Sequence, residues 1–171
     1  MQEGPIVNKV AKSGLVTIDL EEYYDDTPIE IFDLKDYLYQ GLIIREKEFR
    51  KNLEEHDWTR YAGTYVAVHC SSDAIIASWA YMLVTTYAQV YAKEVFFGNR
   101  DDVRYEMFRR KLDKIDWSQY DGKRIILKGC GDKPVPPSAY LLTTKKLLPY
   151  AERVMYGEAC SFVPVYRESK K

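Results

Sequence analysis

Three cysteines are the residues of this chain best suited to chemistry. Cys70 ends the stretch TYVAVHC, Cys130 lies in KGCGDKP, and Cys160 lies in MYGEACSFVP. Three thiolates that converge would bind a soft metal, either zinc or the iron of an iron–sulfur cluster. A single accessible thiolate would instead act as a nucleophile, a sulfur carrier or a redox sensor without metal. A structural or partner-binding module with buried cysteines is the third alternative.

A metal held by three cysteines needs a fourth ligand or leaves an open position. Further candidate ligands near the cysteines are Asp73, Asp132, Glu158 and His69. An open position is typical of a catalytic metal, which would act as a Lewis acid or activate water beside one of these carboxylates. A closed site would be structural or accessory. The sequence does not decide whether the protein is an enzyme.

Several features weigh against the metal. The chain has no CxxC pair, which is the usual zinc-binding spacing. His69 is next to Cys70 on an expected strand, so the two side chains point to opposite faces and His69 is expected to be buried or hydrogen-bonded. His56 lies in the EEHDW turn and is expected to be exposed.

The charged stretch REKEFRK, residues 45–51, has two interpretations. It is typical of a solvated helix face with a Glu46–Arg50 ion pair. Alternatively, Arg45, Glu46 or Lys47 reaches the cysteine edge of the sheet and helps to hold an anion.

An internal repeat organises most of the chain. Residues 57–98 match residues 116–157 at an offset of 59, including YAKEVFFG against YAERVMYG. With one inserted residue, Cys130 matches Cys70. We interpret this as a duplication with two copies. Four aromatic residues repeat with it and are expected to serve in packing: Trp58, Trp117, Tyr81 and Tyr140.

Each copy has the pattern of a β-α-β unit. A β-branched apolar run of strand length is followed by a polar loop, a helical stretch and a second short strand. A crossover of this length makes the two strands parallel. Cys70 and Cys130 then follow the first strand of their copies, and Cys160 follows the last strand. Because the carboxyl ends of parallel strands share one edge, the three cysteines are expected at one edge of one sheet.

The N-terminal part, residues 1–56, has a different pattern. GLVTIDLEEY and PIEIFDL are expected to form an antiparallel β-ribbon across the DDTP turn. Residues 41–56 and 101–112 have helical spacing. The predicted fold class is α/β: a mixed, mainly parallel sheet of about six strands flanked by helices, in a single domain of residues 1–171.

Charge and composition exclude several functional classes. The 171 residues contain 25 basic and 26 acidic side chains, so no general attraction to nucleic acid is expected. No apolar run is long enough to cross a bilayer, and the N-terminal stretch has no export signal. We therefore expect a cytoplasmic protein with reduced cysteines. A free sheet edge would suit a homodimer, and an accessory metal site a protein partner.

Several segments carry a family resemblance: IVNKVAKSGLVTIDL, FDLKDYLYQGLIIREKEFR, SWAYML after Cys70, KGCGDKPVP around Cys130 and YGEACSFVPVY around Cys160. Together they resemble a bacterial family of proteins of unknown function, over nearly the whole chain. The resemblance implies no activity. It implies an association with iron–sulfur assembly genes, which favours iron–sulfur chemistry at the cysteines.

Overall fold

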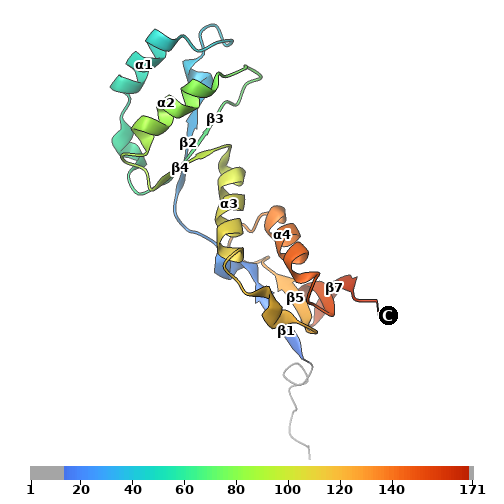
Figure 1. The fold of residues 1–171 in the computed structure, drawn as a ribbon. Coiled ribbons are helices and arrows are strands. Elements are labelled where there is room, and N and C mark those ends of the chain that lie inside the picture. The colour runs from blue at the N-terminus through green and yellow to red at the C-terminus, as the bar shows by residue number, and fades with distance from the viewer. Residues whose placement is uncertain (1–13, 170–171) are drawn as a thin grey trace, which may run out of the picture. The chain divides into compact units, whose positions relative to one another are not determined.

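The computed structural model describes residues 14–169, which form a mixed α/β fold with mainly parallel strands and four α-helices (Figure 1). The predicted fold class is confirmed. The expected single sheet is wrong, because the strands form one sheet of four and one of three. The chain divides accordingly into two compact units. Residues 14–24 and 107–169 belong to unit 1, and residues 25–106 to unit 2.

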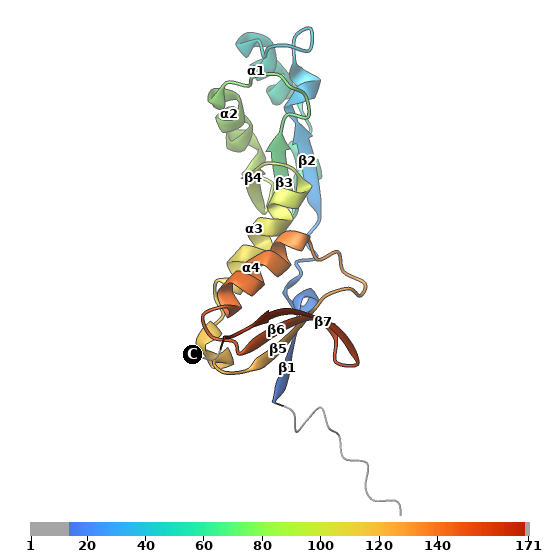
Figure 2. The same ribbon diagram turned by 90° about the vertical axis from the view of Figure 1, so that its right-hand side faces the viewer.

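Unit 1 contains the four-stranded sheet, in the order β1-β5-β6-β7, with β7 antiparallel to its neighbour. Its elements are β1 (Leu15–Asp19), β5 (Arg124–Lys128), β6 (Arg153–Glu158), β7 (Ser161–Arg167), α4 (Pro137–Leu147) and the C-terminal half of α3 (Arg100–Leu112). Both helices pack on the same face of this sheet (Figure 2). Ile125 and Val154 of the sheet share a core there with Leu112 and Leu147 of the helices.

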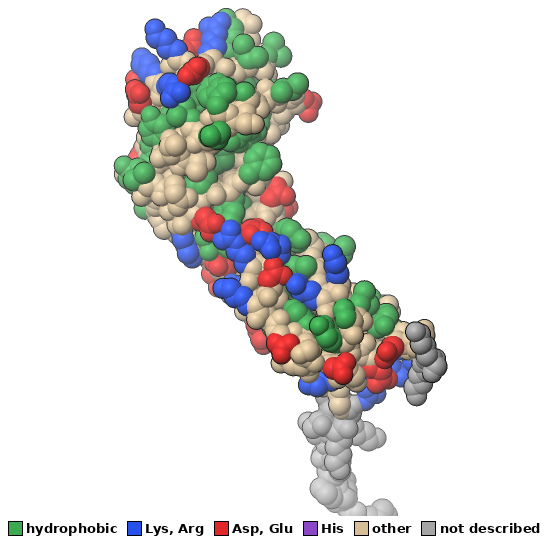
Figure 3. Space-filling view, viewed as in Figure 1, with side chains coloured by type: hydrophobic (Ala, Val, Ile, Leu, Met, Phe, Trp, Pro, Cys, Tyr) green, Lys and Arg blue, Asp and Glu red, His purple; other side chains and the backbone are tan. Residues whose placement is uncertain are grey.

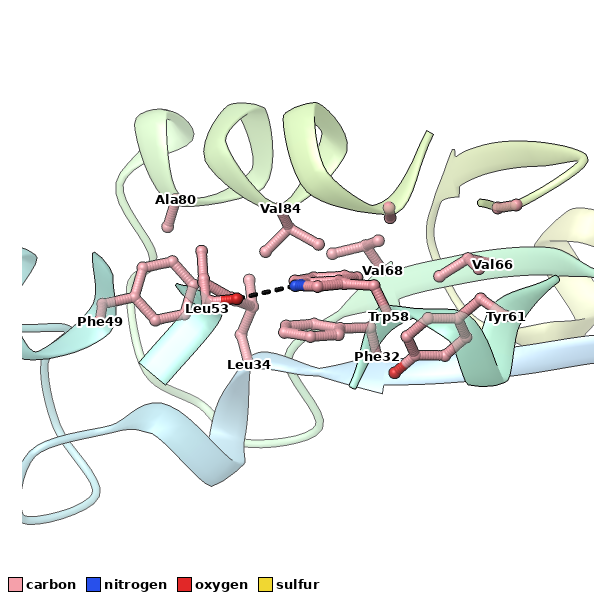
Figure 4. Close-up of a cluster of buried hydrophobic side chains, with 12 residues drawn as sticks. Phe32, Leu34, Phe49, Leu53, Trp58, Tyr61, Val66, Val68, Ala80 and Val84 are labelled. Atoms are coloured by element: carbon pink, nitrogen blue, oxygen red, sulfur yellow. Dashed lines mark hydrogen bonds between the residues drawn. The ribbon is translucent and has the colours of Figure 1, made fainter. Parts of the chain in front are cut away.

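Unit 2 contains the three-stranded sheet, which is parallel throughout in the order β2-β3-β4. Its elements are β2 (Ile29–Asp33), β3 (Tyr65–His69), β4 (Glu94–Phe97), α1 (Glu46–Glu55) and α2 (Ser78–Ala88). Trp58 lies at the centre of its core (Figure 4). The indole ring stacks on Phe32 with centroids 5.4 Å apart, and its Nε1 donates a hydrogen bond of 2.7 Å to the Leu53 carbonyl.

The β-α-β pattern of each repeat is present in the structure. The order is β3-α2-β4 in residues 57–98 and β5-α4-β6 in residues 116–157, with parallel strands in both. A 3₁₀ turn begins each copy, capped in the same way by Asp57 and Asp116. Duplication as the origin of this likeness stays a prediction.

The antiparallel N-terminal ribbon is wrong. β1 and β2 lie in different sheets, where β1 pairs in parallel with β5 and β2 pairs in parallel with β3. The physical reason is burial: Ile18 belongs to the core of unit 1, whereas Phe32 belongs to the core of unit 2. Each strand also supplies the second hydrogen-bonded neighbour of a central strand, which a separate ribbon would leave unpaired.

Two helix predictions differ in outcome. α3 spans nearly the predicted range, whereas α1 starts at Glu46, five residues later than expected. Before it, Gln40 and Gly41 have positive φ angles of 50° and 72°, which are incompatible with a right-handed helix. The absence of an export signal is predicted from residues 1–14, and of these, residues 1–13 lie outside the described residues. Within residues 14–169, no helix has the length and apolar character needed to cross a membrane.

His56 is not exposed as expected but half-buried against the core of unit 2. Its ring lies 3.1 Å from the Tyr61 hydroxyl and 3.2 Å from the Tyr37 hydroxyl. Burial lowers the pKa of His56, and the nearby Arg60 lowers it further. The neutral ring is therefore the form that the fold stabilises.

Acidification is expected to destabilise unit 2 through His56. Because the folded pKa lies below the unfolded value of about 6.5, the contribution is fully present above that pH and is lost as pH falls through the folded pKa. Between pH 7.5 and 5 we expect the thermal midpoint to fall by ~2 °C more in the wild type than in His56→Gln. Identical pH profiles for wild type and His56→Gln would contradict the assignment.

Candidate functional site

The three cysteines are free, but they do not share a sheet edge. Cys70 follows β3 in unit 2, whereas Cys130 follows β5 and Cys160 lies in the β6–β7 turn, both in unit 1. The expectation that one sheet would bring all three together is therefore wrong. Over residues 14–169, no group of three or more His, Cys, Asp or Glu side chains is arranged to hold a metal ion.

Cys130 is the cysteine with the most developed surroundings. Its side chain is exposed, and its sulfur lies 2.7 Å from the Tyr156 hydroxyl and 3.8 Å from the Tyr140 hydroxyl. The two tyrosine rings meet edge to face, with centroids 5.6 Å apart. Two phenolic hydroxyls from α4 and β6 are thus directed at one thiol.

The pKa of both tyrosines is raised, so both stay protonated donors. For Tyr140 the main cause is burial, followed by its hydrogen bond to Cys130. For Tyr156 the hydrogen bond to Cys130 comes first. A protonated phenol beside sulfur can donate to it, and such donors stabilise negative charge that develops on the sulfur during a reaction.

The loop that carries Cys130 is fixed on both sides of the cysteine. Gly129 is buried, with a φ of +155°, and an added Cβ would lie 2.7 Å from the Tyr140 hydroxyl. On the other side, the Gly131 N–H donates a hydrogen bond to the Glu21 carboxylate. Glycine at position 129 therefore allows Tyr140 to approach the thiol.

A charged group lies at the end of β5, two residues before Cys130. The Lys128 ammonium is 3.0 Å from Asp19 and 3.8 Å from Glu158. Burial tends to raise the pKa of Asp19, but hydrogen bonds from Lys128 and from the Glu21 N–H outweigh it and leave this pKa lowered. Lys128 thus ties the loop to β1 and to the β6–β7 hairpin.

An apolar pocket of about 650 Å³ adjoins the two tyrosines. Tyr140 and Tyr156 form part of its wall. The rest is mainly apolar, with Thr144 and Lys145 as its polar members, and its apolar residues are Leu127, Pro137, Leu141, Leu148, Met155 and Val165. Hydrophobic side chains lie exposed along α4 in Figure 3, and Leu141 is 72% exposed. We call this cavity the α4 pocket; its volume suits a small organic molecule.

The equivalent position in unit 2 lacks one of these groups. Cys70 is half-buried and contacts the Ser72 hydroxyl at 3.2 Å. Tyr81 matches Tyr140, but Phe97 stands where unit 1 has Tyr156. The Tyr81–Phe97 ring pair has the same edge-to-face arrangement, at 5.2 Å. At the strand position the two environments differ by one hydroxyl; they differ further in the exposure of the thiol and in the contact of Cys70 with Ser72.

The acidic candidates do not gather around the cysteines. Asp73 and Asp132 are exposed in the loops after β3 and β5. Glu158 is exposed and pairs with Lys128. His69 is half-buried at the end of β3, in register with Asp33. Burial tends to raise the pKa of Asp33, but hydrogen bonds from Ser71 and Lys35 and the charge of His69 leave it lowered.

Arg45 and Glu46 lie at the start of α1 in unit 2. Arg45 pairs with Glu48 at 3.1 Å, and its guanidinium covers the Tyr39 ring at 3.0 Å. Glu46 pairs with Arg50 at 3.0 Å. The predicted solvated helix face with its Glu46–Arg50 pair is therefore confirmed.

The sequence does not predict the contacts of the tyrosine hydroxyls with Cys130. Tyr140 was expected to serve in packing, which it does, but its hydroxyl also faces Cys130. Tyr156 was not selected. One signal could have found it: the repeat aligns Tyr156 with Phe97, so this position differs by one hydroxyl between copies that otherwise agree closely.

Replacing Gly129 with alanine is expected to destabilise unit 1 by ~1–2 kcal/mol. It should also slow the reaction of Cys130 with thiol reagents a few-fold, because the new Cβ displaces the Tyr140 hydroxyl. Gly63→Ala is the matched control, since Gly63 also has a positive φ, of 72°, with nothing within 4 Å of an added Cβ. It should cost stability without changing the rate at Cys130. Equal rates in wild type and Gly129→Ala would contradict the role given to Gly129.

Comparison with known proteins places the chain in a family. No match was found among curated proteins or among solved structures. The model of one protein family matches residues 4–168, which is almost the whole chain. The chain belongs to that family, described as "Protein of unknown function (DUF2480)".

Proposed function

We propose that Cys130 is a reactive thiol that forms a covalent bond to a substrate whose apolar part lies in the α4 pocket. One observation carries the proposal: the two tyrosines whose hydroxyls face the Cys130 sulfur also line the apolar pocket. A thiol nucleophile or carrier needs an accessible sulfur, a donor for developing charge, and a binding surface for the rest of the substrate.

The surroundings of the thiol support acyl transfer as the reaction class. At an acyl substrate, the sulfur would attack the carbonyl carbon, a carbon–sulfur bond would form, and the bond to the leaving group would break. The thiol proton would pass to the leaving group. Tyr156 and Tyr140 would stabilise the charge that moves between sulfur and oxygen during this exchange. The pocket favours an apolar acyl group over a charged one, because its walls offer few polar partners.

Competitive alkylation tests the proposal. The protein is treated briefly with N-methylmaleimide or N-cyclohexylmaleimide, and modification of each cysteine is followed by peptide mass spectrometry. Cys130 should react about tenfold faster than Cys160, although both are exposed, because Cys130 alone of the two has the tyrosine donors. The preference should be larger with the cyclohexyl reagent, which can occupy the α4 pocket.

Leu141→Lys provides the control for the pocket. Leu141 lines the pocket and is 72% exposed, so the substitution should leave the fold intact. It should reduce the advantage of the cyclohexyl reagent and leave the rate with N-methylmaleimide unchanged. Equal reactivity of Cys130 and Cys160 with both reagents would overturn the proposal.

Zinc or iron–sulfur binding is the second candidate function. The observation in its favour is that Cys130 and Cys160 follow the same ends of β5 and β6, which are parallel neighbours. A protein purified without oxygen should then contain about one zinc per chain, or iron with sulfide absorbance, lost in the triple variant Cys70→Ser, Cys130→Ser, Cys160→Ser. Metal-free wild type would reject this candidate, and with it the proposed accessory role in iron–sulfur assembly.

A further inference from the structure

Three arginines form a row across the sheet of unit 1. Arg124 on β5 pairs in register with Arg153 on β6, which pairs with Arg167 on β7. Residues that pair directly on neighbouring strands project from the same face of a sheet, with Cβ atoms about 5 Å apart. Three guanidinium groups therefore leave one face of the sheet side by side. We call them the arginine row.

The arginine row lies in a pocket of its own. All three arginines line a cavity of about 450 Å³. The remaining wall is largely apolar and includes Leu15, Met155, Phe162, Pro164 and Val165. Arg124 begins β5 and Lys128 ends it, so the row is at the opposite end of the strand from the Cys130 loop. The arginine pocket shares Met155 and Val165 with the α4 pocket, but its charged groups lie away from the Cys130 loop.

The positive charge of the row is poorly compensated. Glu152 is the acidic side chain that pairs with the row, and its carboxylate lies 3.4 Å from Arg153 Nε. Among residues 14–169, Arg124 and Arg167 have no ion pair. The Arg153 Nε atom is buried and makes no hydrogen bond to any described group. Like charges directly opposite each other destabilise a sheet. An anion bound between the guanidinium groups would remove this repulsion.

The fold itself does not require arginine at these positions. In unit 2, the equivalent residues at the start of the central strand and of its neighbour are Tyr65 and Glu94, which pair in the same register. Tyr65 packs edge to face on Phe96 and is nearly buried. Unit 2 therefore builds the same β-α-β arrangement without arginines at these positions. We infer that the arginine row has a role other than folding.

We propose that the arginine pocket binds a small organic anion, with a phosphate or carboxylate head group between the guanidinium groups and an apolar tail against Met155 and Phe162. The guanidinium fork matches carboxylate and phosphate oxygens in a bidentate arrangement. The apolar walls exclude a preference for a fully hydrated inorganic ion. A cavity of this size accommodates a head group with a short alkyl chain.

Titration calorimetry with octyl phosphate, octanoate, inorganic phosphate and octanol tests this site. We expect octyl phosphate or octanoate to bind with a dissociation constant below about 1 mM, and inorganic phosphate and octanol to bind at least tenfold more weakly. The comparison between octyl phosphate and octanoate identifies the head group. Binding should weaken as salt increases, because charge pairing contributes to it.

Arg124→Gln and Arg167→Gln should each weaken binding of the preferred octyl anion about tenfold or more. Arg50→Gln, on the exposed face of α1, is the matched control and should bind like the wild type. Circular dichroism confirms that each variant is folded; Arg167 lies on an edge strand, where a substitution is readily tolerated. Octanol binding as tightly as both anions, or unchanged affinity in both row variants, would overturn the proposal. Cys130→Ser should bind the anion normally, so failure of the thiol proposal leaves this result unaffected.

Discussion

Replacing Tyr156 with phenylalanine is expected to slow the alkylation of Cys130 about tenfold at neutral pH. The substitution keeps the ring and its edge-to-face contact with Tyr140 but removes the hydroxyl 2.7 Å from the sulfur. A donor to the sulfur stabilises negative charge that develops there, and the exposure of Tyr156 limits the effect of losing it. Tyr140→Phe should have a smaller effect, since its hydroxyl is 3.8 Å away.

Unit 2 supplies the reciprocal experiment. Phe97→Tyr introduces a hydroxyl at the position equivalent to Tyr156, beside Tyr81, whose pKa is raised by burial and by Cys70. Phe97 is 76% exposed, so the added group should be tolerated. Cys70 should then react faster than in the wild type, while Cys130 is unchanged. If Tyr156→Phe is folded and Cys130 reacts at the wild-type rate, the tyrosine does not activate the thiol.

Replacing Trp58 with alanine is expected to destabilise unit 2 by ~3–5 kcal/mol. The indole is 6% exposed, stacks between Phe32 and Tyr87, and donates to the Leu53 carbonyl. The substitution leaves a large cavity and an unsatisfied carbonyl in one step. Trp58→Phe keeps much of the stacking and should cost less, since mainly the hydrogen bond is lost. Equilibrium unfolding in urea measures both values.

The same experiment asks whether the chain unfolds as one domain, as the sequence predicts. Trp117→Ala is the matched variant in unit 1, where the indole donates to the Leu112 carbonyl at 3.0 Å. If the two units unfold independently, each variant should shift a separate transition. One common transition, lowered by both variants, would support the single domain. A loss below ~1 kcal/mol for Trp58→Ala would contradict the central place of this residue in the core.

The repeat made the β-α-β units predictable, because their helices and strands have strong local patterns. The repeat did not reveal which sheet each of the first two strands joins. The DDTP turn favours a hairpin locally, but pairing is decided by which core buries Ile18 and Phe32. A sequence signal existed: Asp19-Leu20 with Tyr23 recurs as Asp33-Leu34 with Tyr37, after strands that end in the same way. This similarity between β1 and β2 suggests that each occupies the equivalent position in its own sheet.

The candidate site was predictable only in part, because local sequence patterns predict strand ends but not the packing between elements. Cysteine at the carboxyl end of a parallel strand can be read from sequence, and Cys130 lies there. The sequence could not show whether all three cysteines converge, because that depends on which strands join which sheet. The tyrosine hydroxyls come from α4 and β6, so their meeting at one sulfur depends on tertiary packing.

The pairing of β1 with β5 affects the order in which the sheets can form during synthesis. β1 is synthesised early, yet its partner β5 lies roughly 100 residues later, with the whole of unit 2 between them. On the ribosome, unit 2 has all its strands available while unit 1 consists of one strand without a sheet. The strand pairs of unit 2 can therefore form during translation, whereas those of unit 1 can form only after its C-terminal strands have emerged. Until then the open backbone edge of β1 is a target for chaperones and for mispairing between nascent chains.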